Sequence, residues 1–408
     1  MTSLAVADAP GTPVPASYPA VIWLLLGGNF LISTAAFAYP FMAYLVAERG
    51  HAAAMVGAVL AAFGVGWVFG QLVCGWLIDR VGRRLTLTST MLFAAVALIG
   101  MASAHSVWIL LCGAALVGLV YDAPRPVVGA AISELIPDPQ RRAKVDGWRF
   151  GWVINGGAAV SGGLGGLLAG ELGIPVLFWI DGMVCAVFGA LVLCCLPRDV
   201  RRSSEQKGYR QAFGDRRLVL LLASGVATLT AVLGLYAAMP MLMIRHGLDA
   251  GAYGLAYMAN ALTVMTLAPL ITPWLSRRVA PNPRLGIMAA AAVWTTACMS
   301  IGALSTTTMG FSLAAAACAP GEIAWFIVAI GIVHRIAPPA QRGIYHGVWG
   351  TALAIAAVCS PILASVSLEL GGAPLVAATT LAAGLAGAAL SLTLTPILAK
   401  PNDVPTEA

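Results

Sequence analysis

The chain has 408 residues, of which 60% are hydrophobic and only 10% are charged, and its formal net charge is +6. Soluble domains carry roughly 25% charged residues, so the composition excludes an ordinary soluble enzyme. Apolar runs of about 20 residues recur along the whole chain, and each is long enough to cross a hydrocarbon core of roughly 30 Å. We therefore expect an all-α integral membrane protein.

Twelve apolar runs define the transmembrane helices that we expect, numbered here as spans 1 to 12. They cover residues 21–44, 52–79, 85–104, 107–135, 145–171, 174–196, 218–244, 252–276, 285–304, 308–336, 343–369 and 375–398.

The distribution of cations indicates how these spans are oriented. If the N-terminus lies inside, the inner loops with the adjoining ends of the spans and the C-terminal tail hold 20 of the 23 Lys and Arg, while Arg49 and Arg245 lie outside and Arg125 lies near the middle of a span. This asymmetry follows the positive-inside rule, so we expect a plasma (inner) membrane protein with both termini cytoplasmic. The basic excess is a signal of topology and does not indicate a nucleic-acid partner. Residues 1–19 contain no Lys or Arg and are expected to form a flexible N-terminus, not a signal peptide.

The eight cysteines all fall inside expected spans and show no metal-ligand spacing with the five histidines. We therefore expect no disulfide framework and no metal site.

The most informative motif lies between spans 2 and 3, where the charged stretch GWLIDRVGRR separates two apolar runs. A hydrophobic helix that stops at a charged, glycine-containing turn and then restarts indicates a tight hairpin at the membrane surface. The stretch resembles the loop 2–3 signature of the major facilitator superfamily, G-x-L-x-D-R-x-G-R-[KR]. The resemblance implies a gating element rather than a binding site. Its residues are Gly75, Leu77, Asp79, Arg80, Gly82, Arg83 and Arg84.

Span 4 carries Asp122 and Arg125 close to its middle. Ionisable groups inside a membrane are costly and are therefore functional candidates. Three residues apart, the two share a helix face and could form a structural ion pair, although Pro124 and Pro126 should distort the helix. The segment resembles D-P-P-R in one branch of bacterial multidrug exporters, and Arg125 is a candidate to replace the arginine that the superfamily usually carries in span 4. Arg149, in the inner third of span 5, is a second candidate charge partner for Asp122.

Span 5 is rich in glycine, which allows helices to approach closely in lipid. Its run from Asn155 resembles the superfamily's antiporter signature, N-x-G-x-x-x-G-P-x-x-G-G, although Ser161 and Gly162 stand where Gly-Pro is expected. A generic small-residue packing surface is the alternative. The residues concerned are Asn155, Gly157, Ser161, Gly162, Gly165 and Gly166.

Glu322 lies at the centre of span 10 with no cation within a helical turn or two. A carboxyl without a charge partner in a low-dielectric cavity can exchange a proton at physiological pH, so Glu322 is the first candidate for proton coupling and Asp122 is the second. Glu322 also resembles the Gly-Glu of span 10 in several proton-coupled drug exporters. Its alternative role is a protonated, hydrogen-bonded packing residue. For Asp181 in span 6 we favour a role in helix packing or gating.

The second half of the chain repeats the first weakly, at an offset near 200. Pro40 corresponds to Pro240, Ser161 corresponds to Ser360, and the Gln-Arg pair after span 4 recurs after span 10. Two parallel six-helix bundles related by a pseudo-twofold axis, as in the major facilitator fold, are the expected architecture, with a substrate site between them. The bundles would cover residues 20–197 and 218–398, joined by a cytoplasmic linker at 198–217 and followed by a tail at 399–408.

Aromatic residues within the spans are candidates to line a cavity for flat or cationic compounds, although most membrane aromatics simply pack. They are Tyr39, Tyr121, Trp152, Tyr236 and Trp325.

The sequence contains no phosphate-binding loop, nucleophile elbow or metalloprotease motif, so we expect neither an enzyme nor a cofactor. The resemblance implies a monomeric secondary transporter in the lipid bilayer. We expect proton-coupled efflux of amphipathic drugs or small metabolites by alternating access. A proton-coupled importer or narrow-specificity metabolite carrier, and less so a non-transporting receptor, remain alternatives.

Overall fold

The computed structural model describes residues 20–121, 123–136, 138–196, 209–279, 284–338 and 341–395. This part of the chain is helical and contains no strand. In the first half, the helices are α1 (Ala20–Thr34), α2 (Ala38–Glu48), α3 (Ala53–Val81), α4 (Arg83–Ala102), α5 (Val107–Tyr121), α6 (Pro124–Leu135), α7 (Pro139–Trp148), the π-helical turn η1 (Arg149–Ile154), α8 (Asn155–Leu172) and α9 (Ile174–Cys195). In the second half, they are α10 (Tyr209–Gly214), α11 (Arg216–Val232), the 3₁₀ turn η2 (Leu233–Leu235), α12 (Ala238–Arg245), α13 (Ala250–Val279), α14 (Leu285–Ala303), α15 (Thr308–Ile336) and α16 (Arg342–Leu392).

The helices have the length and surface of membrane-spanning segments. Within the described residues, ten helical stretches are long and apolar enough to cross a membrane, and the longest covers Ile344–Leu392. That stretch changes direction at Gly372, whose positive φ of 63° is readily adopted only by glycine. Large apolar side chains such as Trp108 and Val96 are about three-quarters exposed on the outside of the molecule, where lipid would cover them.

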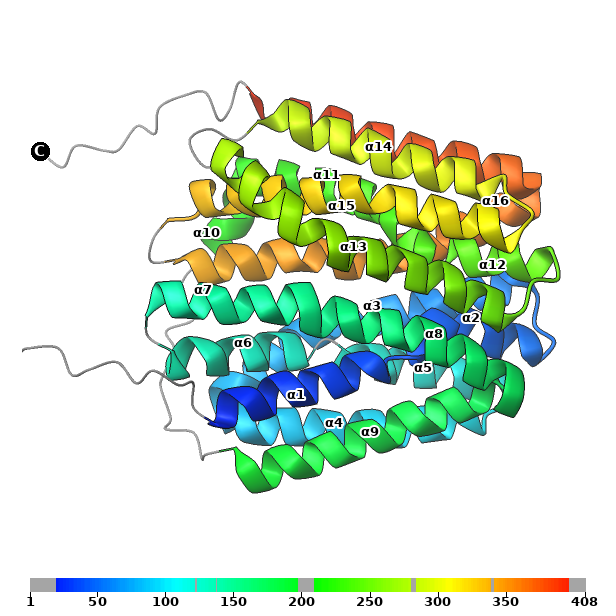
Figure 1. Ribbon diagram of the computed structural model, residues 1–408, viewed down its shortest axis with the longest axis horizontal. Coiled ribbons are helices and arrows are strands. Elements are labelled where there is room, and N and C mark those ends of the chain that lie inside the picture. Colours follow the sequence, from blue (N-terminus) through cyan, green and yellow to red (C-terminus); the bar gives the residue numbers. More distant parts are fainter. Residues whose placement is uncertain are drawn as a thin grey trace, which may run out of the picture.

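The helices lie roughly along one common axis, so the molecule has two ends (Figure 1). The start of α1 and the end of α16 lie at the same end, which we call the terminal end and which is on the left of Figure 1. The opposite end, where α2 and α12 lie, is the far end.

Two of the expected spans are broken near their middle at related positions. Span 1 is interrupted between Thr34 and Ala38, and span 7 is interrupted by η2 before α12 starts at Ala238. Pro40 and Pro240 are each the third residue of the helix that follows the break. A proline clashes with the carbonyl four residues before it but is tolerated in a first turn, so both helices must restart.

The hairpin between α3 and α4 has the turn that the loop 2–3 motif predicts. Gly82 ends α3 and starts α4 with a φ of 84°. Next to it, the Arg80 guanidinium lies over the Trp76 ring, 5.2 Å from its centroid. A matching pair occurs in the second half, where Arg278 lies 4.3 Å from the ring centroid of Trp274. The recurrence of this cation–π pair supports the internal repeat.

Within the first half, α3 packs on α5 and α4 on α9, while in the second half α11 and α14 pack on α16 and α13 packs on α15. The main contacts between the halves are made by α8 with α13 and by α3 with α16. Both contacts depend on glycine. A Cβ at Gly162 would lie 2.8 Å from the Gly254 carbonyl oxygen, and a Cβ at Gly64 would lie 2.6 Å from the Ala357 backbone. Any larger residue would force these helices apart.

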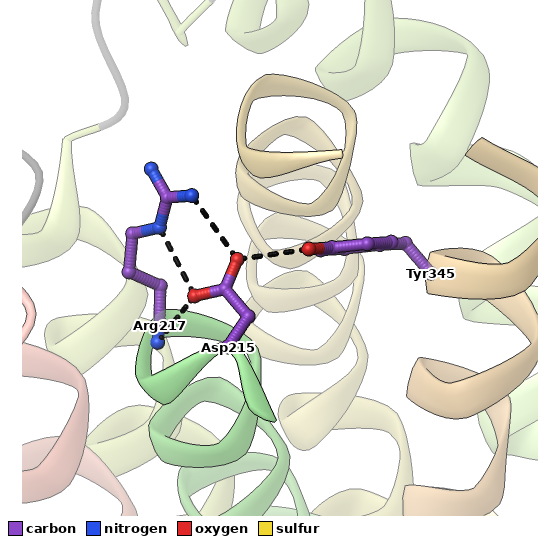
Figure 2. A network of polar contacts seen from close by, with 3 residues as sticks. All are labelled: Asp215, Arg217 and Tyr345. Atoms are coloured by element: carbon purple, nitrogen blue, oxygen red, sulfur yellow. Dashed lines mark hydrogen bonds and ion pairs between the residues drawn. The ribbon is translucent and has the colours of Figure 1, made fainter. Parts of the chain in front are cut away.

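A polar network stabilises the second half at the terminal end, as Figure 2 shows. Asp215 caps α11 and accepts hydrogen bonds from the backbone N–H and the Nε of Arg217, at 2.9 and 3.1 Å. Its other carboxylate oxygen accepts one from Arg217 Nη2 at 3.1 Å and one from the Tyr345 hydroxyl at 3.0 Å. Because Tyr345 belongs to α16, the network joins the start of α11 to the start of α16.

The same network sets the protonation of Asp215. Partial burial by itself would raise the pKa of this carboxyl. The hydrogen bonds and positive charge of Arg217, together with the Tyr345 hydroxyl, outweigh that effect and lower the pKa below its ordinary value. Asp215 is therefore ionised at neutral pH.

Candidate functional site

The breaks in spans 1 and 7 bring two tyrosines together between the halves. Tyr39 is the second residue of α2, and Tyr236 directly follows η2. Their rings stack with a centroid distance of 5.1 Å and an interplanar angle of 29°. Helix breaks at mid-membrane depth are a common way to build a binding site, because they place side chains and freed backbone groups in the interior.

Further aromatic rings from the first half surround Tyr39. The Phe63 ring of α3 stacks on it at 4.5 Å, and the Tyr121 ring at the end of α5 lies 6.0 Å away. Trp67 of α3 contacts Tyr121 edge-on at 5.2 Å. The Tyr39 hydroxyl is buried and finds no hydrogen-bond partner among the described groups, so it is available to a ligand.

The second half contributes the polar side of the cluster. Glu322 lies at the middle of α15, and the Asn260 side chain of α13, which donates to the Ala315 carbonyl of α15 at 3.0 Å, interacts with its carboxyl group. Tyr236, Tyr257 and Cys318 lie within electrostatic range of this carboxyl group. The rings of Tyr257 and Tyr236 pack edge-on, 5.5 Å apart. We call this assembly the tyrosine–Glu322 cluster; its members are Tyr39, Phe63, Trp67, Tyr121, Tyr236, Tyr257, Asn260, Cys318 and Glu322.

The chemistry of the cluster favours a flat or cationic ligand. Aromatic faces attract cations, and a carboxyl without a cationic neighbour adds a negative charge when it is ionised. In the described part of the chain, the interactions of Glu322 come from tyrosine, asparagine and cysteine and not from Lys or Arg. Glu322 also remains partly accessible, so a proton or a ligand can reach it.

The two tryptophans proposed as cavity-lining residues lie elsewhere. Trp325 is 1% exposed and packs against Phe326 and Trp349 in the second half, with centroid distances of 5.2 and 5.6 Å. Trp152 is 57% exposed and lines an open apolar pocket with Trp23 and other residues of α1 and η1. Of the five aromatic candidates, the structure brings together Tyr39, Tyr121 and Tyr236.

The structure describes only some of the charged residues that are candidates for the site in spans 4 and 5. Asp122 lies outside the described residues, and so does the side chain of Arg125, whose backbone is in α6. α5 ends at Tyr121 and α6 starts at Pro124, so the predicted distortion by proline falls next to a residue outside the described part of the chain. Arg149 starts η1, is only 2% exposed, and interacts with the Asp146 carboxylate on the preceding turn.

The loop 2–3 residues lie at the terminal end. Gly75 and Asp79 belong to α3, although the Asp79 side chain lies outside the described atoms. Arg83 is the first residue of α4. Arg84 donates a hydrogen bond to the Leu193 carbonyl near the end of α9, which fixes α4 to α9 within the first half.

The span-5 motif forms a packing surface with two sides. Gly157 and Gly165 face α1 and α2, since a Cβ on them would meet Ser33 and Phe41 at 2.4 and 2.5 Å. Gly162 and Gly166 instead face α13 of the other half. Ser161 Oγ donates a hydrogen bond of 3.2 Å to the Ala36 carbonyl, which the break in span 1 leaves without a helical partner. Asn155, the first residue of α8, follows the π-helical turn.

Sequence reasoning missed several members of the cluster. Asn260 and Tyr257 were not predicted, because a search for ionisable groups passes over neutral polar residues. Their spacing of three residues in span 8, on one helix face, is the signal that could have found them.

In the described residues, the cysteines are free and no group of three or more metal-ligating side chains occurs.

Comparison with known proteins identifies relatives of this chain. The profile of the Major Facilitator Superfamily matches residues 24–331. The inner membrane transport protein YajR of Escherichia coli is 26% identical over 228 residues, which cover 54% of this chain and 49% of YajR. The multidrug resistance protein MdtG of Salmonella paratyphi C is 33% identical over 176 residues, which cover 40% of this chain and 41% of MdtG. The matches thus span about half the length of these relatives or less.

Solved structures share the fold over nearly the whole chain. The nucleoside transporter NupG superposes with a TM-score of 0.70 at 15% identity, covering 94% of this chain and 100% of NupG. A peptide transporter POT in complex with sulfate has a TM-score of 0.75 at 14% identity, covering 93% of this chain and 94% of that one. At such identities, the likeness concerns the fold alone.

Proposed function

The chain belongs to the Major Facilitator Superfamily, and on this basis we propose that it exports amphipathic, cationic drugs or metabolites in exchange for protons. It is a multi-pass membrane transporter of small molecules and not an enzyme. The observation that carries the proposal is the tyrosine–Glu322 cluster, where Tyr236, which lies within electrostatic range of the Glu322 carboxyl, stacks on Tyr39 of the other half. The similarity of part of the chain to multidrug resistance proteins supports this choice of substrate.

Coupling to protons follows from competition at one carboxylate. A lipophilic cation bound among the rings is stabilised by ionised Glu322, whereas a proton on Glu322 removes that attraction. Proton and substrate then exclude each other, which is the condition for exchange by alternating access. Asp122 remains the second candidate for the coupling group, with Arg125 and Arg149 as candidate charge partners.

For the architecture, we propose twelve spans in two six-helix bundles. The ten long stretches become twelve when α16 is divided at Gly372 and when α5 and α6 are joined as one broken span. The bundles cover residues 20–197 and 218–398, connected by the linker 198–217 and flanked by tails at 1–19 and 399–408. The loop 2–3 residues would then act as a gate between states, in a protein that works as a monomer.

For the orientation, we propose that the terminal end faces the cytoplasm, because most Lys and Arg lie in the loops at this end. A fluorescent protein fused to the C-terminus should fold and fluoresce in cells of a bacterial host. An active periplasmic phosphatase at the same place would contradict the orientation.

The alternative is an importer or a narrow-specificity carrier with the same fold. The structural similarity to nucleoside and peptide transporters shows that this fold does not itself fix a substrate. The aromatic content of the cluster favours the drug exporter.

The function is tested in lipid vesicles that contain the purified protein and hold an acidic interior. Adding a lipophilic cation such as tetraphenylphosphonium outside should discharge the pH gradient with wild type, and Glu322→Gln should reduce discharge to the level of empty vesicles. Glu171→Gln, an exposed carboxyl in α8, is the matched control and should behave as wild type. Coupled flux that survives Glu322→Gln but is lost in Asp122→Asn would move the coupling role to Asp122. No flux with any drug of a panel would contradict drug export.

A further inference from the structure

Asp181 is a buried carboxylate that plays no part in the proposed coupling. It lies in α9, is 6% exposed, and its interactions within the described residues include no Lys or Arg. Its Oδ2 accepts a hydrogen bond of 3.1 Å from the backbone N–H of Ala38. The neighbouring N–H of Phe37, which donates to the Ala35 carbonyl at 2.7 Å, also interacts with the same carboxyl group. On its own helix, the Cys185 thiol donates to Oδ1 at 3.7 Å.

These bonds place the carboxylate at the N-terminus of α2, directly after the break in span 1. The break leaves the first N–H groups of α2 without helical partners, deep in the protein where water cannot replace them. The side chain of the residue that precedes α2, Phe37, cannot cap the helix. Asp181 therefore supplies from another helix the hydrogen-bond acceptor that caps α2.

The helix held in this way carries much of the contact between the halves at the far end. Tyr39 of α2 stacks on Tyr236, as described above, and Phe41 packs edge-on against Tyr253 at 5.5 Å. The Tyr44 hydroxyl donates to the Leu248 carbonyl at 3.3 Å. α2 therefore forms one wall of the tyrosine–Glu322 cluster and also contacts the second half at the far end.

At the related break in span 7, no hydrogen bond from the α12 N-terminus to a carboxyl side chain occurs among the described residues. Thr380 lines a small pocket together with Gly234 and Ala238, at the start of α12. In the described part of the chain, the first half therefore has an acidic side chain bonded to the helix after the break, whereas a neutral side chain lies near the break in the second half.

We propose that Asp181 is a positioning residue that clamps α2 through its N-terminal amides, so that α2 holds the far end closed and presents Tyr39 to the substrate. The consequence for transport rests on the proposed function, whereas the clamp itself does not. Opening the far end then requires α2 to move together with α9 or to release Asp181.

The test is hydrogen–deuterium exchange on the purified full-length protein without substrate, so that its outcome does not depend on drug export. In wild type, the Ala38 amide should exchange about tenfold more slowly than the Ala238 amide, because only the former donates to a buried carboxylate. In Asp181→Asn, amides of α2 should exchange about tenfold faster than in wild type, while those of α12 should be unchanged. Cys185→Ala and Thr380→Val are the controls and should leave α2 as it is in wild type.

Two results would overturn the proposal. One is equal exchange at Ala38 and Ala238 in wild type, which can be measured even where a variant fails to fold. The other is faster exchange in Asp181→Asn that extends equally to α4 and α12, since this would indicate general destabilisation. Tyr44→Phe should add little to the effect of Asp181→Asn on α2 if both act through the same helix, and full additivity would also count against the clamp.

Discussion

At the scale of single residues, the proposed site combines the carboxyl group of Glu322 with the aromatic rings of the cluster. Tyr236 occupies the central position, because its ring contacts Tyr39 of the first half and Tyr257 of the second. It also lies within electrostatic range of Glu322. A ligand between the halves would therefore meet the Tyr236 ring together with the carboxylate.

Removing the Tyr236 ring should weaken cation binding. A cation–π contact in a desolvated site contributes about 1–2 kcal/mol, so Tyr236→Ala should raise the Kd for tetraphenylphosphonium roughly tenfold, while Tyr236→Phe should keep most of the affinity. Binding can be followed by fluorescence quenching or calorimetry with the purified protein. Trp152→Ala, which removes a ring outside the cluster, is the control. An unchanged affinity in Tyr236→Ala would place the cation elsewhere.

A second residue-scale prediction concerns the pH dependence of stability at the terminal end. Asp215→Asn should lower the stability of the second half by about 1–2 kcal/mol at neutral pH, because charge-assisted hydrogen bonds are lost. Since the pKa of Asp215 is lowered in the folded protein, its contribution is present above the ordinary aspartate pKa and is lost as the pH falls through the lower, folded-state value.

The measurement is thermal unfolding of wild type and Asp215→Asn over a range of pH. The difference in Tm should be constant above roughly pH 5 and should shrink below roughly pH 4. Tyr345→Phe removes a single bond to the same carboxylate and should have a smaller effect. A difference that persists unchanged in acid would contradict the role of the ionised carboxylate.

At the scale of elements, the interface between the halves depends on how closely α8 approaches α13. A Cβ at Gly162 would meet the Gly254 carbonyl oxygen and the Met258 backbone nitrogen, both at 2.8 Å. Backbone atoms cannot turn aside as a flexible side chain can. The glycine motif of span 5 is therefore a requirement of packing between the halves, whatever else it does.

Gly162→Ala should push α8 away from α13 and cost roughly 1–3 kcal/mol of stability, and it should also reduce transport because the halves can no longer close at this place. Thermal unfolding and vesicle flux measure the two effects. Gly170→Ala lies on the same helix with open space around its Cβ and should have neither effect. Normal flux in Gly162→Ala would show that the close approach is not needed for the transport cycle.

The sequence predicts where the helices lie better than it predicts which side chains contact one another. Helix positions followed from apolar length, and the distortion in span 4 followed from its prolines. Glu322 could be selected because ionisable groups are rare in membranes. Trp152 and Trp325 could not be placed, since a helix that is apolar on all sides does not reveal which face turns inward. The bonds of Asp215 with Tyr345 and of Asp181 with α2 join distant segments, and no local pattern encodes them.

At the scale of the whole molecule, we propose that a proton and a cationic substrate compete for Glu322 between the two halves of the transporter. Competition requires that binding of one ligand lowers the affinity for the other, and this linkage is reciprocal. Under this proposal, the entry of protons down their gradient would drive export of the substrate.

The most direct test is proton release when the purified protein binds tetraphenylphosphonium in weakly buffered detergent solution. For wild type, we predict release of about one proton per cation bound, which falls to about zero in Glu322→Gln while the variant still binds the cation. The Glu171→Gln control should release protons as wild type does. Binding without proton release in wild type, or unchanged release in Glu322→Gln, would contradict the claim that Glu322 couples the two ligands.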